Sequence, residues 1–198
     1  MKQTISAALL LLVLSGCVSQ ALITTNINRD WQQHQAQIAQ LQSWELQGKL
    51  GFNSAQRGGS ANLSWHQQQQ QYSVSLSGPF GAGTALIEGD QHLASMRQGD
   101  QIYRNSPALL AQQLTGLAIP VDALSWWARG LPSPSEMPLS NLVSAPSGEA
   151  KSFEQAGWQL SFSNYRSADN LSLPRKITGE FGDQRFKLII SSWSFPQP

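Results

Sequence analysis

The stretch ANLSWHQQQQQYSVSLS (residues 61–77) alternates apolar and polar side chains on both sides of a run of glutamines. Leu63 and Trp65 share one parity before the run, and Val74 and Leu76 share one parity after it. A period of two over several residues is typical of a strand that buries one face. The stretch therefore predicts two adjacent antiparallel strands with a common apolar face. We interpret the glutamine run between them as a low-complexity loop and not as a site.

The same period of two recurs on both sides of this stretch. Turn residues such as Gly89-Asp90 and Gly99-Asp100 separate the next short segments. The alternation stops in the middle of the chain and returns near its end. The expected strands are 44–52, 61–65, 72–77, 84–88, 92–97 and 101–104, followed by 158–162, 175–181 and 186–190.

Three segments carry the start and stop signals of helices. Asp30 suits an N-cap, with Gln33 at the capping-box position. Ser106 and Pro107 mark a second helix start, and Gly116 suits the end of that helix. The three predicted helices cover 31–42, 107–115 and 121–129.

The predicted layout is one helix, about six strands, two helices and then three or more strands. Residues 132–150 are rich in Pro, Ser and Gly and leave no room for a long element. A sheet of nine or more twisted strands tends to curl. The sequence therefore predicts a mainly β protein of the α+β class, an unclosed antiparallel β-barrel or half-barrel lidded by helices.

The apolar faces of the first three strands would line the inside of such a barrel. This interior is either a tightly packed core or a hydrophobic cavity, and alternation alone leaves both open. The candidate positions are Trp44, Leu46, Leu50, Phe52, Leu63, Trp65, Tyr72, Val74 and Leu76.

The first seventeen residues are typical of a secretory leader. Ile5–Leu14 is apolar except for one serine, and ten residues are too short to span a bilayer of about 30 Å. The run ends in Leu14-Ser15-Gly16-Cys17, which resembles the lipobox of bacterial lipoproteins; an ordinary signal peptide with a chance Cys is the alternative. We predict a signal peptide over 1–16, lipid attachment at Cys17, a tether over 17–29 and a single domain over 30–198. In well-studied Gram-negative bacteria, an Asp directly after the lipidated Cys retains a lipoprotein in the inner membrane. Here that position is Val18, which implies that the protein is anchored in the inner leaflet of the outer membrane, on its periplasmic side.

Composition and motifs argue against several other classes. Charged residues make up 13% of the chain and the net charge is only +1. This balance argues against a nucleic-acid binder, because such proteins carry a strongly basic surface. The single Cys and the scattered His34, His66 and His92 give no metal-ligand spacing, and no nucleophile motif occurs. We therefore expect no enzyme activity, no metal and no cofactor.

One predicted turn carries an apolar residue near its tip. Gly78, Pro79, Phe80 and Gly81 lie between two expected strands, although turn tips are normally polar. Phe80 either folds back into the core or is exposed and enters a lipid surface or a partner. Burying one Phe contributes about 1.5–3 kcal/mol, enough to hold a tethered protein against a membrane.

Three segments resemble the LolB family of bacterial lipoprotein-sorting receptors. They are Trp31–Gln35, then Leu114–Pro120 with Trp127 and Gly130–Pro132, and finally Gln184–Leu188 through Trp193. Their order, behind a lipobox, is similar to the family pattern from about Trp31 to Trp193. The resemblance implies an unclosed β-barrel covered by helices that encloses an apolar cavity.

The resemblance also implies a task. A LolB protein accepts mature triacylated lipoproteins from the periplasmic carrier LolA and inserts them into the outer membrane without ATP. The family's exposed aliphatic residue for membrane insertion corresponds to Phe80, and Leu109, Leu114 and Trp127 are candidates for the lid. We expect a monomer whose partners are LolA, lipoprotein substrates and outer-membrane lipid. The alternatives are a lipocalin-like module for a free hydrophobic ligand and a structural accessory of envelope assembly.

Overall fold

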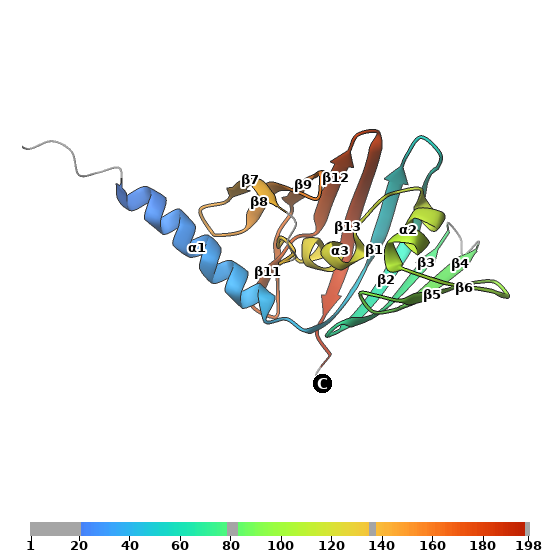
Figure 1. Cartoon of the computed structure of the whole chain (residues 1–198). Helices are drawn as coiled ribbons and strands as arrows, with labels where there is room; N and C mark the ends of the chain where they lie inside the picture. The colour runs from blue at the N-terminus through green and yellow to red at the C-terminus, as the bar shows by residue number, and fades with distance from the viewer. Residues whose placement is uncertain (1–20, 79–82, 135–137, 197–198) are drawn as a thin grey trace, which may run out of the picture.

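The computed structural model describes residues 21–78, 83–134 and 138–196, with side chains from residue 30 onward (Figure 1). The predicted signal segment 1–16, Cys17 and Pro79–Gly81 lie outside these ranges. The roles assigned to those residues therefore stay predictions, as does the division into signal, tether and domain.

Eleven antiparallel strands form one curled sheet in the order β6-β5-β4-β3-β2-β1-β13-β12-β9-β8-β7. The two edge strands, first and last in this order, do not pair with each other, so the barrel is unclosed as predicted. A separate hairpin, β10-β11, completes the strands. The strands are β1 (Ser43–Asn53), β2 (Gly58–Gln68), β3 (Gln71–Ser77), β4 (Thr84–Gly89), β5 (Ala94–Gln98), β6 (Gln101–Asn105), β7 (Leu139–Ser144), β8 (Ala150–Gln155), β9 (Trp158–Ser163), β10 (Arg166–Ala168), β11 (Leu171–Leu173), β12 (Lys176–Phe181) and β13 (Gln184–Ser194).

Three helices accompany the sheet: α1 (Ala21–Ala39), α2 (Pro107–Thr115) and α3 (Val121–Ala128). In Figure 1, α2 and α3 lie against the central strands, and the amino-terminal end of α1 points away from the sheet. Gly116 adopts the left-handed conformation that ends α2, with φ of 74°, as its place in the sequence predicts. Within the described ranges, we find no helix long and apolar enough to cross a membrane.

The first helix starts earlier than the sequence predicts. Asp30 is not an N-cap, because α1 already begins at Ala21 and part of the predicted tether is helical. Packing of Trp31 and Ile38 against the core holds the carboxyl-terminal half of the helix. Once those turns are fixed, each further residue adds one hydrogen bond at little entropic cost, and the helix extends past a local capping signal.

Two glycines allow neighbouring strands to come into close contact. The pairing of β1 with β13 shifts register between Gln47 and Gly48, and a Cβ at Gly48 would overlap the carbonyl oxygen of Ile189. A Cβ at Gly179 would overlap the ring of Phe186 on the neighbouring strand. Gly48 lies at an irregularity in strand pairing, which bends a strand locally, and Gly179 makes room for the Phe186 ring.

Burial follows the predicted alternation where the strand signal is strong. Trp158, Leu160 and Phe162 are buried along β9, while Gln159 and Ser161 between them are exposed. Four strands were not predicted: β7, β8, β10 and β11. Their segments are short or lack a regular period, and pairing with neighbours in the sheet supplies what local sequence does not.

Candidate functional site

An apolar cavity of about 80 Å³ lies between the inner face of the sheet and the two middle helices. Strands β1 to β4 and β13 form its floor, and α2, α3 and the segment between them cover it. No charged side chain lines it. The lining residues are Leu50, Leu63, Trp65, Tyr72, Val74, Leu76, Ile87, Pro107, Ala111, Leu114, Thr115, Leu117, Ile119, Val121, Leu124, Phe186 and Leu188.

A wider and more polar cavity of about 680 Å³, which we call the mouth, adjoins the apolar one. Trp65, Tyr72, Pro107 and Val121 line both cavities, so the two cavities meet at these side chains. The mouth is otherwise formed by polar ends of β2 and β3, by the α1–β1 connection and by α3. These other lining residues include Gln67–Gln71, Asp90, Asp122, Ser125, Trp126 and Arg129.

The glutamine run belongs to this mouth and is not a loose loop. Gln67 and Gln68 end β2, and Gln71 begins β3, so only Gln69 and Gln70 form the turn. Gln67 is buried: its Oε1 accepts from the Trp65 indole at 3.0 Å, and its Nε2 donates to the Gln69 carbonyl at 2.9 Å. Composition suggested a low-complexity segment, whereas the register of the hairpin orders it.

The nine candidate positions of the first three strands divide into cavity and core. Leu46 is 1% exposed and Phe52 packs against Gly59, and neither lines a cavity. Trp44 lines the mouth alone. The other six line the apolar cavity: Leu50, Leu63, Trp65, Tyr72, Val74 and Leu76.

The three lid candidates also differ. Leu114 lines the apolar cavity from α2. Leu109 is 51% exposed and lines neither cavity, because it lies on the outer side of the same helix. Trp127 is fully buried on the far side of α3, where its indole N–H donates to Gln155 Oε1 at 2.8 Å. Leu109 and Trp127 therefore do not line either cavity, and their role in a lid stays a prediction.

Sequence reasoning missed most of the cover. Leu117, Ile119, Val121 and Leu124 lie in or beside the α2–α3 connection, where no simple period shows which side chains point inward. Phe186 and Leu188 had a visible strand parity, but only the pairing of β13 with β1 brings them to the cavity.

Arg129 is the buried cation of the mouth. Its Nη1 donates to the Leu41 carbonyl at 2.9 Å, and its guanidinium lies 4.4 Å from the centre of the Trp126 ring. Burial lowers the pKa of Arg129 to about 10. No carboxylate in the described part of the chain forms an ion pair with it.

Tyr72 is the buried hydroxyl between the two cavities. Its side chain is 9% exposed, and its hydroxyl oxygen is buried without a hydrogen-bond partner. Burial, assisted by the charge of Asp90, raises the pKa of Tyr72 to about 12. The group is therefore a neutral donor at neutral pH.

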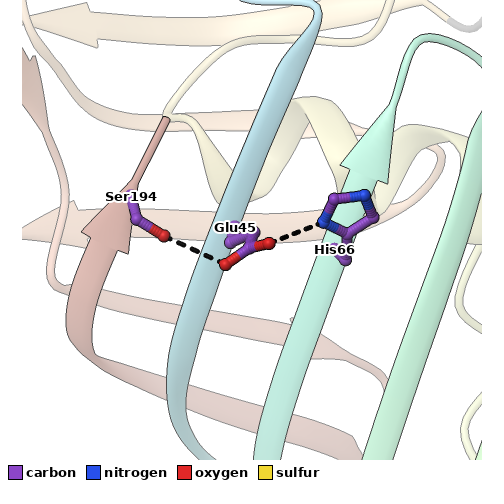
Figure 2. A network of polar contacts seen from close by, with 3 residues as sticks. All are labelled: Glu45, His66 and Ser194. Atoms are coloured by element: carbon purple, nitrogen blue, oxygen red, sulfur yellow. Dashed lines mark hydrogen bonds and ion pairs between the residues drawn. The ribbon is translucent and has the colours of Figure 1, made fainter. Parts of the chain in front are cut away.

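A hydroxyl, a carboxylate and an imidazole do meet on the outer face of the sheet (Figure 2). Ser194 Oγ donates to Glu45 Oε2 at 3.2 Å, and His66 Nδ1 lies 2.8 Å from Glu45 Oε1. A serine nucleophile needs the imidazole beside it, but here the carboxylate stands between them. The network thus links β13, β1 and β2 without activating Ser194. In the described residues there is also no cluster of side chains suited to a metal ion.

The chain is similar to known proteins over most of its length. A family model described as outer membrane lipoprotein LolB matches residues 42–193. The outer-membrane lipoprotein LolB of Cellvibrio japonicus is 38% identical over 186 residues, covering 91% of this chain and 90% of that relative. That of Chromohalobacter salexigens is 32% identical, covering 93% and 86%.

Solved structures share the architecture at low identity. A LolA superfamily protein from Nitrosomonas europaea superposes with a TM-score of 0.59 at 10% identity, covering 85% of this chain and 94% of that one. A DUF1329 family protein from Desulfovibrio piger gives a TM-score of 0.56 at 7% identity, covering 87% and 92%. At these identities the likeness concerns the fold alone.

Proposed function

The chain belongs to the LolB family of outer-membrane lipoproteins, and from this premise we propose that it accepts mature lipoproteins from the periplasmic carrier LolA. It then inserts them into the inner leaflet of the outer membrane without ATP. It works as a monomer and a transport receptor, and its own attachment to the membrane is through the lipid on Cys17.

The single observation that carries this proposal is the apolar cavity beneath α2 and α3. Its lining is aliphatic and aromatic apart from Thr115 and the Tyr72 hydroxyl, and no lining residue is charged. Such a surface has no use in binding a polar ligand, but it suits hydrocarbon chains. A polar mouth leading into it leaves room for the rest of an acylated protein.

Transfer between membranes requires that the acyl chains of the lipoprotein stay out of water. Exposing a triacylated protein to water costs tens of kcal/mol, at about 0.8 kcal/mol per CH₂. Passing the chains directly from one apolar cavity to another avoids this cost. Direction then needs only that the second cavity binds the chains more tightly and afterwards yields them to lipid.

Loading requires the cover to move. The apolar cavity holds about 80 Å³, whereas pockets for ligands of drug size hold about 300–1,000 Å³. Leu114, Val121 and Leu124 fill the space between helices and sheet. Entering acyl chains would displace these side chains and separate α2 from the inner face of β2 and β3.

Release uses the turn between β3 and β4. The flanking backbone is closed by a hydrogen bond from the Gly78 N–H to the Gly83 carbonyl at 3.1 Å. Phe80 lies within this turn and outside the described residues. We assign it the role of entering the membrane surface, in place of the large aliphatic residue of the family pattern.

A transfer assay tests the proposal. Protein lacking residues 1–17 is mixed with LolA that carries a radiolabelled triacylated lipoprotein, and the label is followed by pull-down. Movement of the label without ATP supports acceptor function. If the label stays on a carrier that can load another acceptor, the proposal is wrong, and a binding module for a free hydrophobic ligand becomes the better explanation.

A further inference from the structure

The Tyr72 hydroxyl is a buried donor that the free protein leaves unused. Its oxygen has no hydrogen-bond partner, and the residue lines both the apolar cavity and the mouth. A buried polar atom without a partner destabilises the fold and is rare in proteins. A partner that arrives with the substrate would explain why the hydroxyl is kept at this junction.

A second donor lies in the same mouth. Arg129 is buried, and its Nε and Nη1 contact the backbone carbonyls of Ser125, Ile38 and Leu41. Guanidinium has five N–H donors and no acceptor, so these contacts leave donors unused. The amides of Gln68 and Gln71 add further donors at the rim.

The substrate of the proposed function has acceptors at the matching place. In a triacylated cysteine, two ester groups and one amide join the hydrocarbon chains to the polypeptide. Ester carbonyls accept hydrogen bonds and offer no donor in return. We call these two esters and the amide the joint of the substrate. When the hydrocarbon chains lie in the apolar cavity, the joint lies where that cavity meets the mouth.

We propose that the mouth is a binding site for the acylated cysteine itself, in which the Tyr72 hydroxyl donates to a carbonyl of the joint. This inference rests on the proposed function and adds a polar contact that fixes the substrate with its chains inward. The protein thereby distinguishes a lipoprotein from a bare hydrocarbon. Arg129 and the amides of Gln68 and Gln71 are further hydrogen-bond donors in the mouth. The negative charges of Asp90 and Asp122 disfavour an anionic headgroup there.

The experiment compares Tyr72→Phe with the parent in the whole mature chain, made with Cys17→Ala so that it stays in solution. Two probes are used: diphenylhexatriene, a pure hydrocarbon, and a synthetic peptide with an N-palmitoylated, dipalmitoylglyceryl cysteine that displaces it. Loss of one hydrogen bond should weaken peptide binding about 2- to 10-fold. Diphenylhexatriene binding should not change, and Tm should stay the same or rise because an unsatisfied hydroxyl is removed.

Tyr103→Phe is the matched control, because Tyr103 lies on β6, bonds to Gln101 and lines neither cavity. It should leave both probes unaffected. Equal peptide affinity in Tyr72→Phe and the parent, equal loss for both probes, or a clear fall in Tm would overturn the inference. Failure of the parent chain to bind the peptide at all would instead refute the proposed function.

Discussion

The indole N–H of Trp127 donates to Oε1 of Gln155 at 2.8 Å, and this bond joins helix α3 to strand β8. The same oxygen accepts from the backbone N–H of Ser133 at 2.8 Å, and Gln155 Nε2 donates to the Ser133 carbonyl at 2.9 Å. One buried amide therefore holds both α3 and the segment that follows it. The inner face of α3, with Val121 and Leu124, has no such polar attachment and faces the cavity.

Replacing this amide should destabilise the whole domain. Gln155→Leu keeps the side chain's approximate size but removes the partner of the Trp127 indole and two contacts to Ser133. We expect the free energy of unfolding to fall by about 2–4 kcal/mol, measured by urea denaturation. Gln159→Leu, at an exposed position on β9, is the control and should change it by less than about 0.5 kcal/mol. Similar losses in both variants would show that the amide has no special role.

Filling the apolar cavity should block uptake while sparing the fold. Val74→Phe adds volume at a half-buried position that lines the cavity. We expect acceptance of lipoprotein from LolA to fall about 10-fold or more, with a change in stability of about 1–3 kcal/mol at most. Ser75→Phe, next along β3 and pointing to the other face, should leave acceptance intact. Undiminished transfer by Val74→Phe would mean that the chains bind elsewhere.

Stability should depend on pH through His34. Burial lowers the pKa of His34 below its ordinary 6.5, against a smaller opposing effect of Glu149, and its Nε2 has no partner. The Tyr165 ring and the Glu149 carboxylate are the titratable groups that face it. As pH falls, the unfolded chain protonates His34 before the folded protein does. The contribution of neutral His34 to the free energy of unfolding is therefore complete above pH 6.5 and is lost as pH falls below that value.

Urea denaturation from about pH 7.5 down to about pH 5 measures this effect, with a slope of at most about 1.4 kcal/mol per pH unit. The slope assigned to His34 should disappear in His34→Gln and persist in His92→Gln, whose imidazole is exposed. An unchanged slope in His34→Gln would assign the pH dependence to other groups.

The turn between β3 and β4 should separate uptake from insertion. Phe80→Glu replaces an apolar residue, whose burial contributes about 1.5–3 kcal/mol, by a charge that lipid rejects. We expect normal acceptance of label from LolA but at least about a 10-fold slower delivery to liposomes, followed by flotation. Leu93→Glu is the control: Leu93 is 58% exposed at the opposite end of β4 and should have no effect. Equal loss of acceptance and delivery in Phe80→Glu would remove the separate role of the turn.

The alternation in residues 61–77 was sufficient to predict a hairpin with one buried face, and Leu63, Trp65 and Leu76 are buried as expected. Hydrophobic burial acts on each strand locally, so a period of two is visible before any partner is known. The resemblance of short motifs correctly indicated the family. The strands β7 and β8 could not be predicted in this way, because their local pattern is weak and they are held by pairing with each other and with β9.

The sequence by itself determined which side of each strong strand faces inward, because alternation of apolar and polar residues requires it. Only the tertiary structure decided that Leu46 packs in the core while Leu63 and Val74 line a cavity. All three side chains lie on the inner face of the sheet, and they differ in what α2 and α3 place opposite them. The tertiary structure likewise joined Arg129 to Leu41 and Trp127 to Gln155, since contacts between residues far apart in the chain follow from packing geometry and leave no periodic signal in the sequence.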